Sequence, residues 1–269
     1  EAHQVSISAF VQDRFPYRAS VPDFEFIKML GAGTFGRVVQ VRHRASGAIF
    51  AMKIIRKQKF HSIRNVVEVR RERSVLENLS NPYVLRINAT FQSESRIYFL
   101  LDYLPGGELL RHTQKAPGHH FNEEAAKFYI AELAVALEYL RVRGIVHRDI
   151  KGDNLVLDED GHLVLTDFGF AKKLRSGPKK DKTCCGTLAY IAPEMLQIHR
   201  TGYGVEVDWW SMGVVLFTVL TGYFPFLKTT RKDTVNAIIN HPLQFPSKPA
   251  LTAEARDCCH QLMAKKPEN

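Results

Sequence analysis

The chain has 269 residues, of which 45% are hydrophobic and 24% are charged, so it can bury a large core in one two-lobed unit or two small domains, which excludes a disordered chain. The 37 basic residues outnumber the 28 acidic ones, and the net charge of +9 invites nucleic acid or acidic membranes as partners. No RNA-reading aromatic motif, zinc-finger spacing or basic arm accompanies this charge, so we expect no nucleic acid partner.

The four cysteines form two neighbouring pairs, Cys184-Cys185 and Cys258-Cys259. Neighbours of this kind differ from the spaced disulfide framework of a small secreted domain, which favours reduced thiols and a location in the cytoplasm or nucleus. The first fifteen residues mix charged and apolar positions, so they do not form the apolar segment of a signal peptide. The apolar run from Met212 to Leu220 is far shorter than the about 20 residues of a membrane span. We therefore expect a soluble protein without a transmembrane segment.

Residues 1–22 form an N-terminal extension, which fits a short packed helix and a frayed terminus equally well. The glycine-rich stretch 31–36 (GAGTFG) then lies between two apolar runs. A GxGxxG pattern alone is weak evidence. A dinucleotide site requires a helix after the glycines, whereas the β-branched residues Val38, Val39 and Val41 continue as a strand. The pattern predicts a strand–turn–strand flap. Glycines at the tip of such a flap let backbone N–H groups approach phosphates. An ordinary glycine hairpin is the alternative.

Residues 49–55 (IFAMKII) predict a buried strand that carries a single charge, Lys53. A lysine in such a strand is costly unless it is paired. The next segment has apolar residues at helical spacing and offers two acids one turn apart, Glu68 and Glu72. Either acid could also be only a surface residue.

Two further apolar runs, 84–87 and 96–101, complete an antiparallel sheet. Residues 102–108 (DYLPGGE) then break the periodicity with proline and paired glycines, so we place a linker between two lobes here. This divides the chain into the extension, a first lobe over 23–103 and a second lobe over 104–269. A helix follows, whose apolar face we assign to Ala125, Phe128, Tyr129, Ala131, Leu133, Leu137 and Leu140.

The stretch 147–154 (HRDIKGDN), followed by Asp167-Phe168-Gly169, places polar residues at fixed offsets between short apolar runs that predict buried strands. Asp149 can accept the proton of an attacking hydroxyl, and Lys151 can neutralise charge on a moving phosphoryl group. Asn154 and Asp167 offer hard oxygen ligands for Mg²⁺. A turn-rich hairpin pair with surface acids is the alternative, and the eight ordered positions followed by DFG argue against it.

With these motifs, the sequence resembles the eukaryotic protein kinases over nearly its whole length. The lysine two residues after Asp149, together with Thr187 in GTLAYIAPE, resembles serine/threonine rather than tyrosine kinases. The stretches LTDFGFAKKL, TCCGT, VDWWSMGVVLF and YLPGGELL resemble the AGC group, the cyclic-nucleotide-dependent and S6-type kinases. Calcium/calmodulin-like kinases are the next most similar class.

The resemblance implies a two-lobed α+β fold, with an antiparallel five-stranded sheet and helix C in the first lobe and a mainly helical second lobe. It implies phosphoryl transfer from ATP with Mg²⁺ to protein serine or threonine, with Asp149, Lys151 and Lys53 as catalytic residues. The family spacing from Lys53 favours Glu72 as its partner. The implied nucleotide contacts are Gly31, Ala32, Gly33, Thr34, Phe35, Gly36, Val38, Ala51, Lys53, Leu101, Asp102, Leu104, Glu108, Val156 and Asp167.

Substrate selection and regulation are also implied by the resemblance. Glu108 matches the acid that reads an arginine three positions before the phosphoacceptor, Asp153 matches a second such acid, and Thr187 belongs to the substrate-binding segment. Thr183 occupies the position of the activating phosphothreonine, which an upstream kinase or autophosphorylation would supply. The phosphate could contact Arg148 and Lys172, and further cations lie nearby in sequence, namely Lys173, Arg175, Lys179, Lys180 and Lys182. The alternatives are that Thr183 is an ordinary loop threonine or that Ser176 is the modified residue.

The sequence departs from the family pattern in several places. Gly152 replaces a bulkier residue, Leu188-Ala189 replaces Pro-Glu, and Thr218 stands where dibasic-selective members have a further acid. These changes indicate a basic substrate preference narrower than the dibasic type. The sequence stops just before the arginine that normally pairs with the acid matching Glu194, which we interpret as a trimmed catalytic domain.

Two other classes of protein compete with this interpretation. A pseudokinase or nucleotide-binding scaffold would lack part of the catalytic set, but Lys53, Asp149, Asn154 and Asp167 are all present. A basic nucleic-acid-binding module would show tight, steeply salt-dependent binding.

Overall fold

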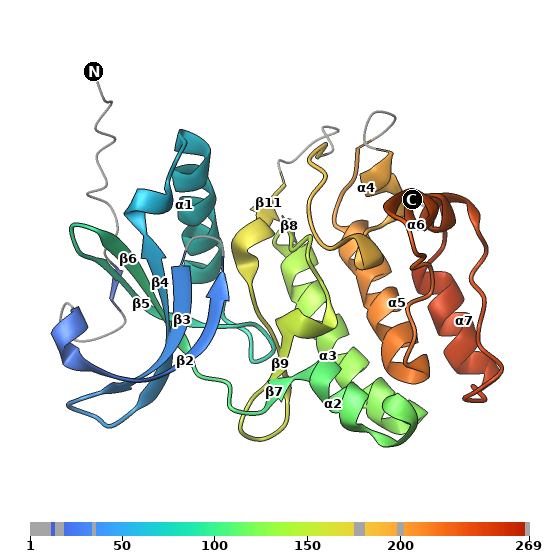
Figure 1. Ribbon diagram of the computed structural model, residues 1–269, viewed down its shortest axis with the longest axis horizontal. Helices are drawn as coiled ribbons and strands as arrows, with labels where there is room; N and C mark the ends of the chain where they lie inside the picture. Colours follow the sequence, from blue (N-terminus) through green and yellow to red (C-terminus); the bar gives the residue numbers. More distant parts are fainter. Residues whose placement is uncertain (1–11, 14–18, 34–35, 175–180, 198–201, 267–269) are drawn as a thin grey trace. The chain divides into compact units, whose positions relative to one another are not determined.

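The computed structural model describes residues 12–13, 19–33, 36–174, 181–197 and 202–266. The chain separates into two compact units. The first comprises Glu1–Ser80 and Leu85–Leu104, and the second comprises Asn81–Val84 and Pro105–Asn269. The short segment 81–84 therefore belongs to the second unit although residues of the first unit flank it in sequence. Each unit has its own sheets and helices (Figure 1).

An antiparallel sheet forms the body of the first unit, in the strand order β1-β5-β6-β4-β3-β2. The predicted five-stranded sheet is thus confirmed, and the two-residue strand β1 pairs with the edge of β5. The bounds are β1 Gln12–Asp13, β2 Phe24–Gly33, β3 Gly36–His43, β4 Ile49–Arg56, β5 Ile87–Gln92 and β6 Arg96–Asp102. Helix α1 (Ile63–Glu77) lies beside this sheet (Figure 1).

The central strand β4 is buried on both faces, since neighbouring residues Met52, Ile54 and Ile55 are all almost fully covered. On one side of the sheet, Phe91 stacks on both Phe24 and Tyr98, with ring centroids 6.0 and 5.0 Å apart. Burial on both faces explains why this strand reads as a continuous apolar run rather than an alternating one. It also means that the charge of Lys53 must be satisfied within the protein.

The second unit is mainly helical, as expected. Helix α5 packs between α3 and α7, and every residue from Trp210 to Thr221 is buried (Figure 1). A helix that is apolar on all sides is a core helix. The helices of this unit are α2 Leu109–Lys115, α3 Glu123–Val142, α4 Pro193–Leu196, α5 Glu206–Thr221, α6 Arg231–Asn240 and α7 Ala253–Leu262.

Helix α3 corrects one expectation. Phe128 and Ala131, assigned to the apolar face, are exposed, and Glu132 is buried instead. The carboxylate of Glu132 accepts hydrogen bonds from Leu163 N at 2.7 Å and from the ring of His162 at 2.5 Å. Leu133, Leu137 and Leu140 are buried as predicted, so only part of the predicted face is wrong. Glu132 can take a buried position because both of its oxygens have hydrogen-bond partners.

Short strands of the second unit support the loops that carry the polar motifs. Strand β7 (Gly107–Glu108) pairs with β9 (Leu155–Leu157), which pairs with β10 (Leu163–Leu165), and β8 (Ile145–Val146) pairs with β11 (Lys172–Lys173). Single turns of 3₁₀ helix lie at Val21–Asp23, Lys57–Lys59, Pro117–His119, Gly152–Asn154, Phe168–Phe170 and Leu188–Tyr190. In the described part of the chain, no helix is both long enough and apolar enough to cross a bilayer.

Candidate active site

In the first unit, strand β4 and helix α1 bring Lys53 and Glu72 together. Lys53 Nζ lies 2.5 Å from Glu72 Oε1, and the Glu72 side chain is only 8% exposed. The alternative acid Glu68 faces a different partner, Arg64 Nε, at 2.9 Å. A half-buried lysine in an apolar strand thus has the charge partner that its cost of burial requires.

Strands β2 and β3 form the antiparallel hairpin that the glycine-rich pattern predicts, with Gly33 opposite Gly36. A Cβ atom at Gly31 or Gly33 would meet nothing within 4 Å, whereas one at Gly36 would lie 1.7 Å from the carbonyl oxygen of Ile54. Gly36 is therefore required for the close approach of β3 to β4. Thr34 and Phe35, which the sequence also singled out, lie outside the described residues.

The remaining predicted nucleotide contacts divide between the units. In the first unit, Ala51 and Leu101 are opposite each other on β4 and β6. The Asp102 side chain there accepts from Arg86 and Asn88, at 3.1 and 2.7 Å. Val38 lies opposite Lys53 on the neighbouring strand, and Ala32 and Leu104 are the other candidates. In the second unit, Glu108 lies opposite Val156 across β7 and β9.

The carboxylate of Asp149 is buried and has three side-chain partners. Lys151 Nζ lies 2.9 Å from Asp149 Oδ2, and Thr187 Oγ1 donates to Oδ1 at 2.9 Å. Asn154 Nδ2 donates to the backbone oxygen of Asp149 at 2.8 Å and to Oδ2 at 3.2 Å. The Lys151 ammonium also reaches Thr187 Oγ1 at 3.2 Å. The structure thus brings four predicted site residues into one network around a single carboxylate.

A buried acid from α5 holds the backbone of this loop. Asp208 accepts hydrogen bonds from His147 N at 2.6 Å and from Arg148 N at 2.8 Å. Burial raises the pKa of Asp208, and the nearby His147 and these two hydrogen bonds oppose that rise. Arg148 adopts a left-handed backbone conformation, with φ of 71°, which a non-glycine residue rarely occupies. The loop therefore depends on Asp208 to keep a costly conformation.

The Asp-Phe-Gly stretch is fixed by backbone and ring contacts. Asp167 also has a left-handed φ, of 57°, and its Oδ1 accepts from Gly169 N at 3.3 Å. Phe168 is fully buried and packs edge-to-face on the ring of His147, with centroids 4.8 Å apart. Thr166 donates both its N–H and its hydroxyl to the Asn154 carbonyl, at 2.8 and 3.0 Å. The two proposed metal ligands are thus linked through one residue.

Asn154 and Asp167 fit a magnesium ion, which takes few of its ligands from the protein. Both donors of the Asn154 amide nitrogen are directed at Asp149, so its oxygen is the group left to bind a cation. No cluster of three or more histidine, cysteine, aspartate or glutamate side chains suited to a metal occurs among the described residues. Mg²⁺ typically takes one or two carboxylate or amide ligands and completes its shell with phosphate and water oxygens.

Sequence reasoning missed Asp181. Its side chain is almost fully buried, forms an ion pair with Lys172 Nζ, and lies 3.7 Å from Arg148 Nη1. Burial raises the pKa of Asp181, but the hydrogen bonds from Lys172 and Thr183 together outweigh this effect and bring the pKa down to about 2. The carboxylate is therefore ionised at neutral pH. The only signal in the sequence was one acid among lysines, in the stretch KKDKT.

The predicted regulatory and substrate residues have defined surroundings. Thr183 is exposed, whereas Arg175, Lys179 and Lys180 lie outside the described residues. Glu108 accepts from Arg111 Nε at 2.8 Å, and Asp153 is exposed. Thr218 is buried and donates to the carbonyl of Val214 at 2.8 Å, so its hydroxyl is already engaged within the core.

The protein kinase domain family model matches residues 24–269. The chain belongs to this family. It is 39% identical to a RAC family serine/threonine-protein kinase homolog of Dictyostelium discoideum, over 93% of this chain and 55% of that protein. It is 38% identical to human ribosomal protein S6 kinase alpha-6, over 99% and 35%. It is 42% identical to the Caenorhabditis elegans serine/threonine-protein kinase sgk-1, over 84% and 48%.

These similarities confirm the resemblance to AGC-group kinases. The kinase-domain chain spans about half the length of its relatives or less. The activity, substrates and partners of the whole protein are therefore matters for proposal and experiment.

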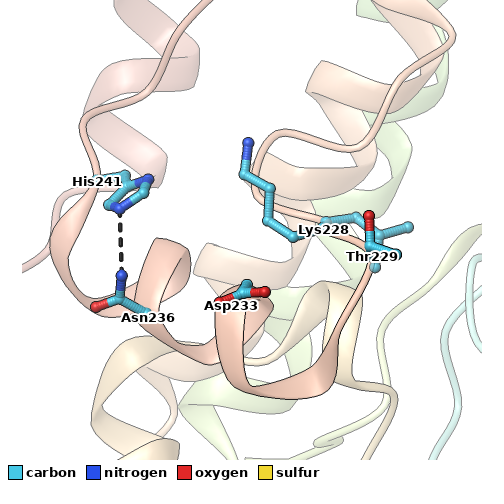
Figure 2. Close-up of a pocket in the computed structure, with 6 residues that line it drawn as sticks. Lys228, Thr229, Asp233, Asn236 and His241 are labelled. Atoms are coloured by element: carbon cyan, nitrogen blue, oxygen red, sulfur yellow. Dashed lines mark hydrogen bonds between the residues drawn. The ribbon is translucent and has the colours of Figure 1, made fainter.

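This kinase domain also has a pocket away from the predicted residues, beside helix α6. Its volume is about 660 Å³, and Figure 2 shows the His241 ring hydrogen-bonded to Asn236 at one side of it. The lining residues are Leu227, Lys228, Thr229, Asp233, Asn236 and His241. None of them belongs to the network around Asp149.

The structure gives a reason for the unusual Gly152. A Cβ atom at this position would lie 2.9 Å from Leu110 Cβ and 3.6 Å from Leu110 Cα. Both atoms are close to the backbone of α2, so rotation of the Leu110 side chain does not remove the clash. A leucine on α2 therefore occupies the space that a bulkier residue needs after Lys151.

We predict that Gly152→Ala lowers the free energy of unfolding by about 1–3 kcal/mol, because overpacking must shift α2 or the catalytic loop. The measurement is urea unfolding followed by circular dichroism. Gly31→Ala is the matched control and should change stability by less than about 0.5 kcal/mol, since a Cβ there meets nothing. Equal stability of the two variants would show that Leu110 yields without cost.

Proposed function

We propose that this chain is the catalytic domain of an ATP-dependent protein serine/threonine kinase. The observation that carries the proposal is the network in which Lys151, Asn154 and Thr187 all contact the buried carboxylate of Asp149. A carboxylate held in this way has a fixed orientation and a cation beside it. The carboxylate can accept a proton, and the cation can stabilise negative charge that develops on a neighbouring phosphoryl group.

In the proposed reaction, the hydroxyl oxygen of a substrate serine or threonine attacks the γ-phosphorus of ATP. Its proton passes to Asp149, the new O–P bond forms, and the bond from the γ-phosphorus to the bridging oxygen breaks as ADP leaves with the electron pair. Lys151 stabilises the charge on the moving phosphoryl group. Thr187 and Asn154 keep the Asp149 oxygens in place, and Asp208 holds the backbone on which Asp149 is mounted.

In the first unit, Lys53 is the proposed ligand of the α- and β-phosphates, and Glu72 holds its ammonium in position. Asn154 and Asp167 would hold Mg²⁺, which neutralises charge on the phosphate oxygens when bound. The remaining nucleotide contacts are proposed from the family pattern. A pseudokinase or scaffold is the alternative, and the paired state of both Lys53 and Asp149 favours the enzyme.

The proposed partners are protein substrates with basic residues before the phosphoacceptor, read by Glu108 and Asp153. A second partner is the kinase that phosphorylates Thr183, unless the protein does so itself. We propose a cytoplasmic or nuclear location from the neighbouring cysteines, which are free thiols in the structure.

Asp149→Asn tests the central proposal. We expect peptide phosphorylation with ATP and Mg²⁺ to fall by about 10²–10⁴-fold, because the amide cannot take the hydroxyl proton. A peptide library and labelled ATP provide the measurement. Lys53→Met should abolish phosphorylation as well. Asp160 is an exposed acid in the β9–β10 turn, so Asp160→Asn serves as the control for the loss of a charge. Undiminished turnover by correctly folded Asp149→Asn protein would exclude the assigned role.

Glu108→Ala tests substrate reading. A charge-assisted hydrogen bond contributes about 1.5–3 kcal/mol, and we expect the low end here because Glu108 is one-third exposed and already paired with Arg111. The ratio kcat/KM should therefore fall roughly tenfold for peptides with arginine three positions before the phosphoacceptor. Peptides without that arginine should be unaffected.

Arg111→Ala is the matching variant for the same test. It should raise kcat/KM for the arginine peptide, because it frees Glu108 from its partner within the chain. A loss of equal size for both peptides in Glu108→Ala would count against the reading of arginine.

Thr183 is the proposed regulatory site. A phosphate there adds about −1.5 to −2 charges, so it should strengthen the contacts of its segment with Arg148 and Lys172 and raise peptide turnover at saturating ATP. Protein carrying phosphothreonine at position 183 is compared with Thr183→Ala for turnover and for trypsin cleavage after Lys182. Equal values in both assays would rule out the switch.

A further inference from the structure

Asp181 is the anchor of the segment that leads to Thr187. Its backbone N–H and carbonyl both pair with Tyr203, each at 3.0 Å. Its carboxylate accepts from Thr183 N at 2.8 Å and contacts the ammonium of Lys172. The side chain is 2% exposed. A carboxylate buried to this extent needs charge partners to remain ionised.

Arg148 reaches the same place from the catalytic loop. Its Nε donates to the carbonyl of Phe170 at 2.8 Å, and its Nη1 donates to the Tyr203 hydroxyl at 3.2 Å. The Tyr203 hydroxyl in turn donates to the carbonyl of Thr183 at 2.5 Å. Arg148 is 3% exposed, so two buried or half-buried cations, Arg148 and Lys172, face the single carboxylate of Asp181. Without this carboxylate the two cations would repel each other.

The anchor acts on Asp149 through a short path. Gly186, with φ of 95°, packs so closely on the catalytic loop that a Cβ would lie 2.4 Å from the carbonyl oxygen of Arg148. The next residue, Thr187, donates to Asp149 Oδ1 at 2.9 Å. Asp181 fixes one end of residues 181–187, and Thr187 contacts the catalytic carboxylate at the other end.

We propose that Asp181 is a positioning residue that supplies, within the unmodified chain, the negative charge that orders residues 181–187 and holds Arg148 beside Asp149. The inference rests on the proposed kinase function and deepens it. Residues 181–187 are then ordered before Thr183 is phosphorylated, and the phosphate adds further contacts to a segment that is already in place. Thr183 contacts Asp181 through both its backbone N–H and its side chain, and its carbonyl accepts from the Tyr203 hydroxyl.

The test is Asp181→Asn in unphosphorylated protein, because asparagine keeps the shape and the acceptor for Thr183 N but removes the charge. We expect at least a tenfold loss in kcat for peptide, an unchanged KM for ATP, and faster trypsin cleavage after Lys182. Asp160→Asn is the control and should match the parent protein in all three measurements. Parent-like values for Asp181→Asn would overturn the inference.

Lys172→Met separates charge from packing. If Lys172 acts through Asp181, its removal adds no loss to the Asp181→Asn variant, whereas independent packing contributions would add. Additive losses would therefore count against the anchor. Because Lys172 is 37% exposed, we expect Lys172→Met to fold even where Asp181→Asn does not. In that case, faster cleavage after Lys182 in Lys172→Met supports the anchor, and unchanged cleavage overturns it.

The proteolysis measurement does not require catalysis. If the parent protein phosphorylates no peptide in the library, the proposed function fails. The cleavage rates of the variants still decide whether Asp181 orders the segment.

Discussion

The arrangement of the second unit depends on one buried carboxylate, that of Asp208. It lies on a helix that is covered on all sides and accepts hydrogen bonds from two successive backbone N–H groups, those of His147 and Arg148. This pair of bonds stabilises the left-handed conformation of Arg148. As a result, the Arg148 side chain turns toward Phe170 and Tyr203, while Asp149 turns toward Lys151 and Thr187. Asp208 thereby orients both Arg148, which contacts the segment at Tyr203, and Asp149, the proposed proton acceptor.

Several features of the fold and the site could be predicted from the sequence, because the cost of burying a charge limits which residues can pair. A lysine in an apolar strand needs an acid, and Glu72 is its partner at 2.5 Å. The strands that flank the catalytic loop are indicated by short apolar runs. The family and the five-stranded sheet could also be predicted, because the motifs occur in a fixed order over most of the chain.

The sequence does not predict contacts that depend on the path of the chain in space. Asp181 and Arg148 are far apart in sequence, and no periodicity relates them, so the sequence does not single out this acid among lysines. Gly152 and Leu110 meet because α2 passes close to the catalytic loop. The exposed Phe128 shows a third limit, since the buried face of α3 is decided by the two partners of Glu132 and not by apolar spacing alone.

The placement of Asp208 on a core helix has a consequence for the dynamics of the molecule. The amide protons of His147 and Arg148 exchange with solvent only when Asp208 releases them. Because α5 is buried from Trp210 to Thr221, it has no inexpensive local opening of its own. We therefore expect these two amide protons to exchange as slowly as the core of the second unit, although loops are usually among the first segments to open. A variant that loosens the core of this unit loses the loop and the fold in the same transition.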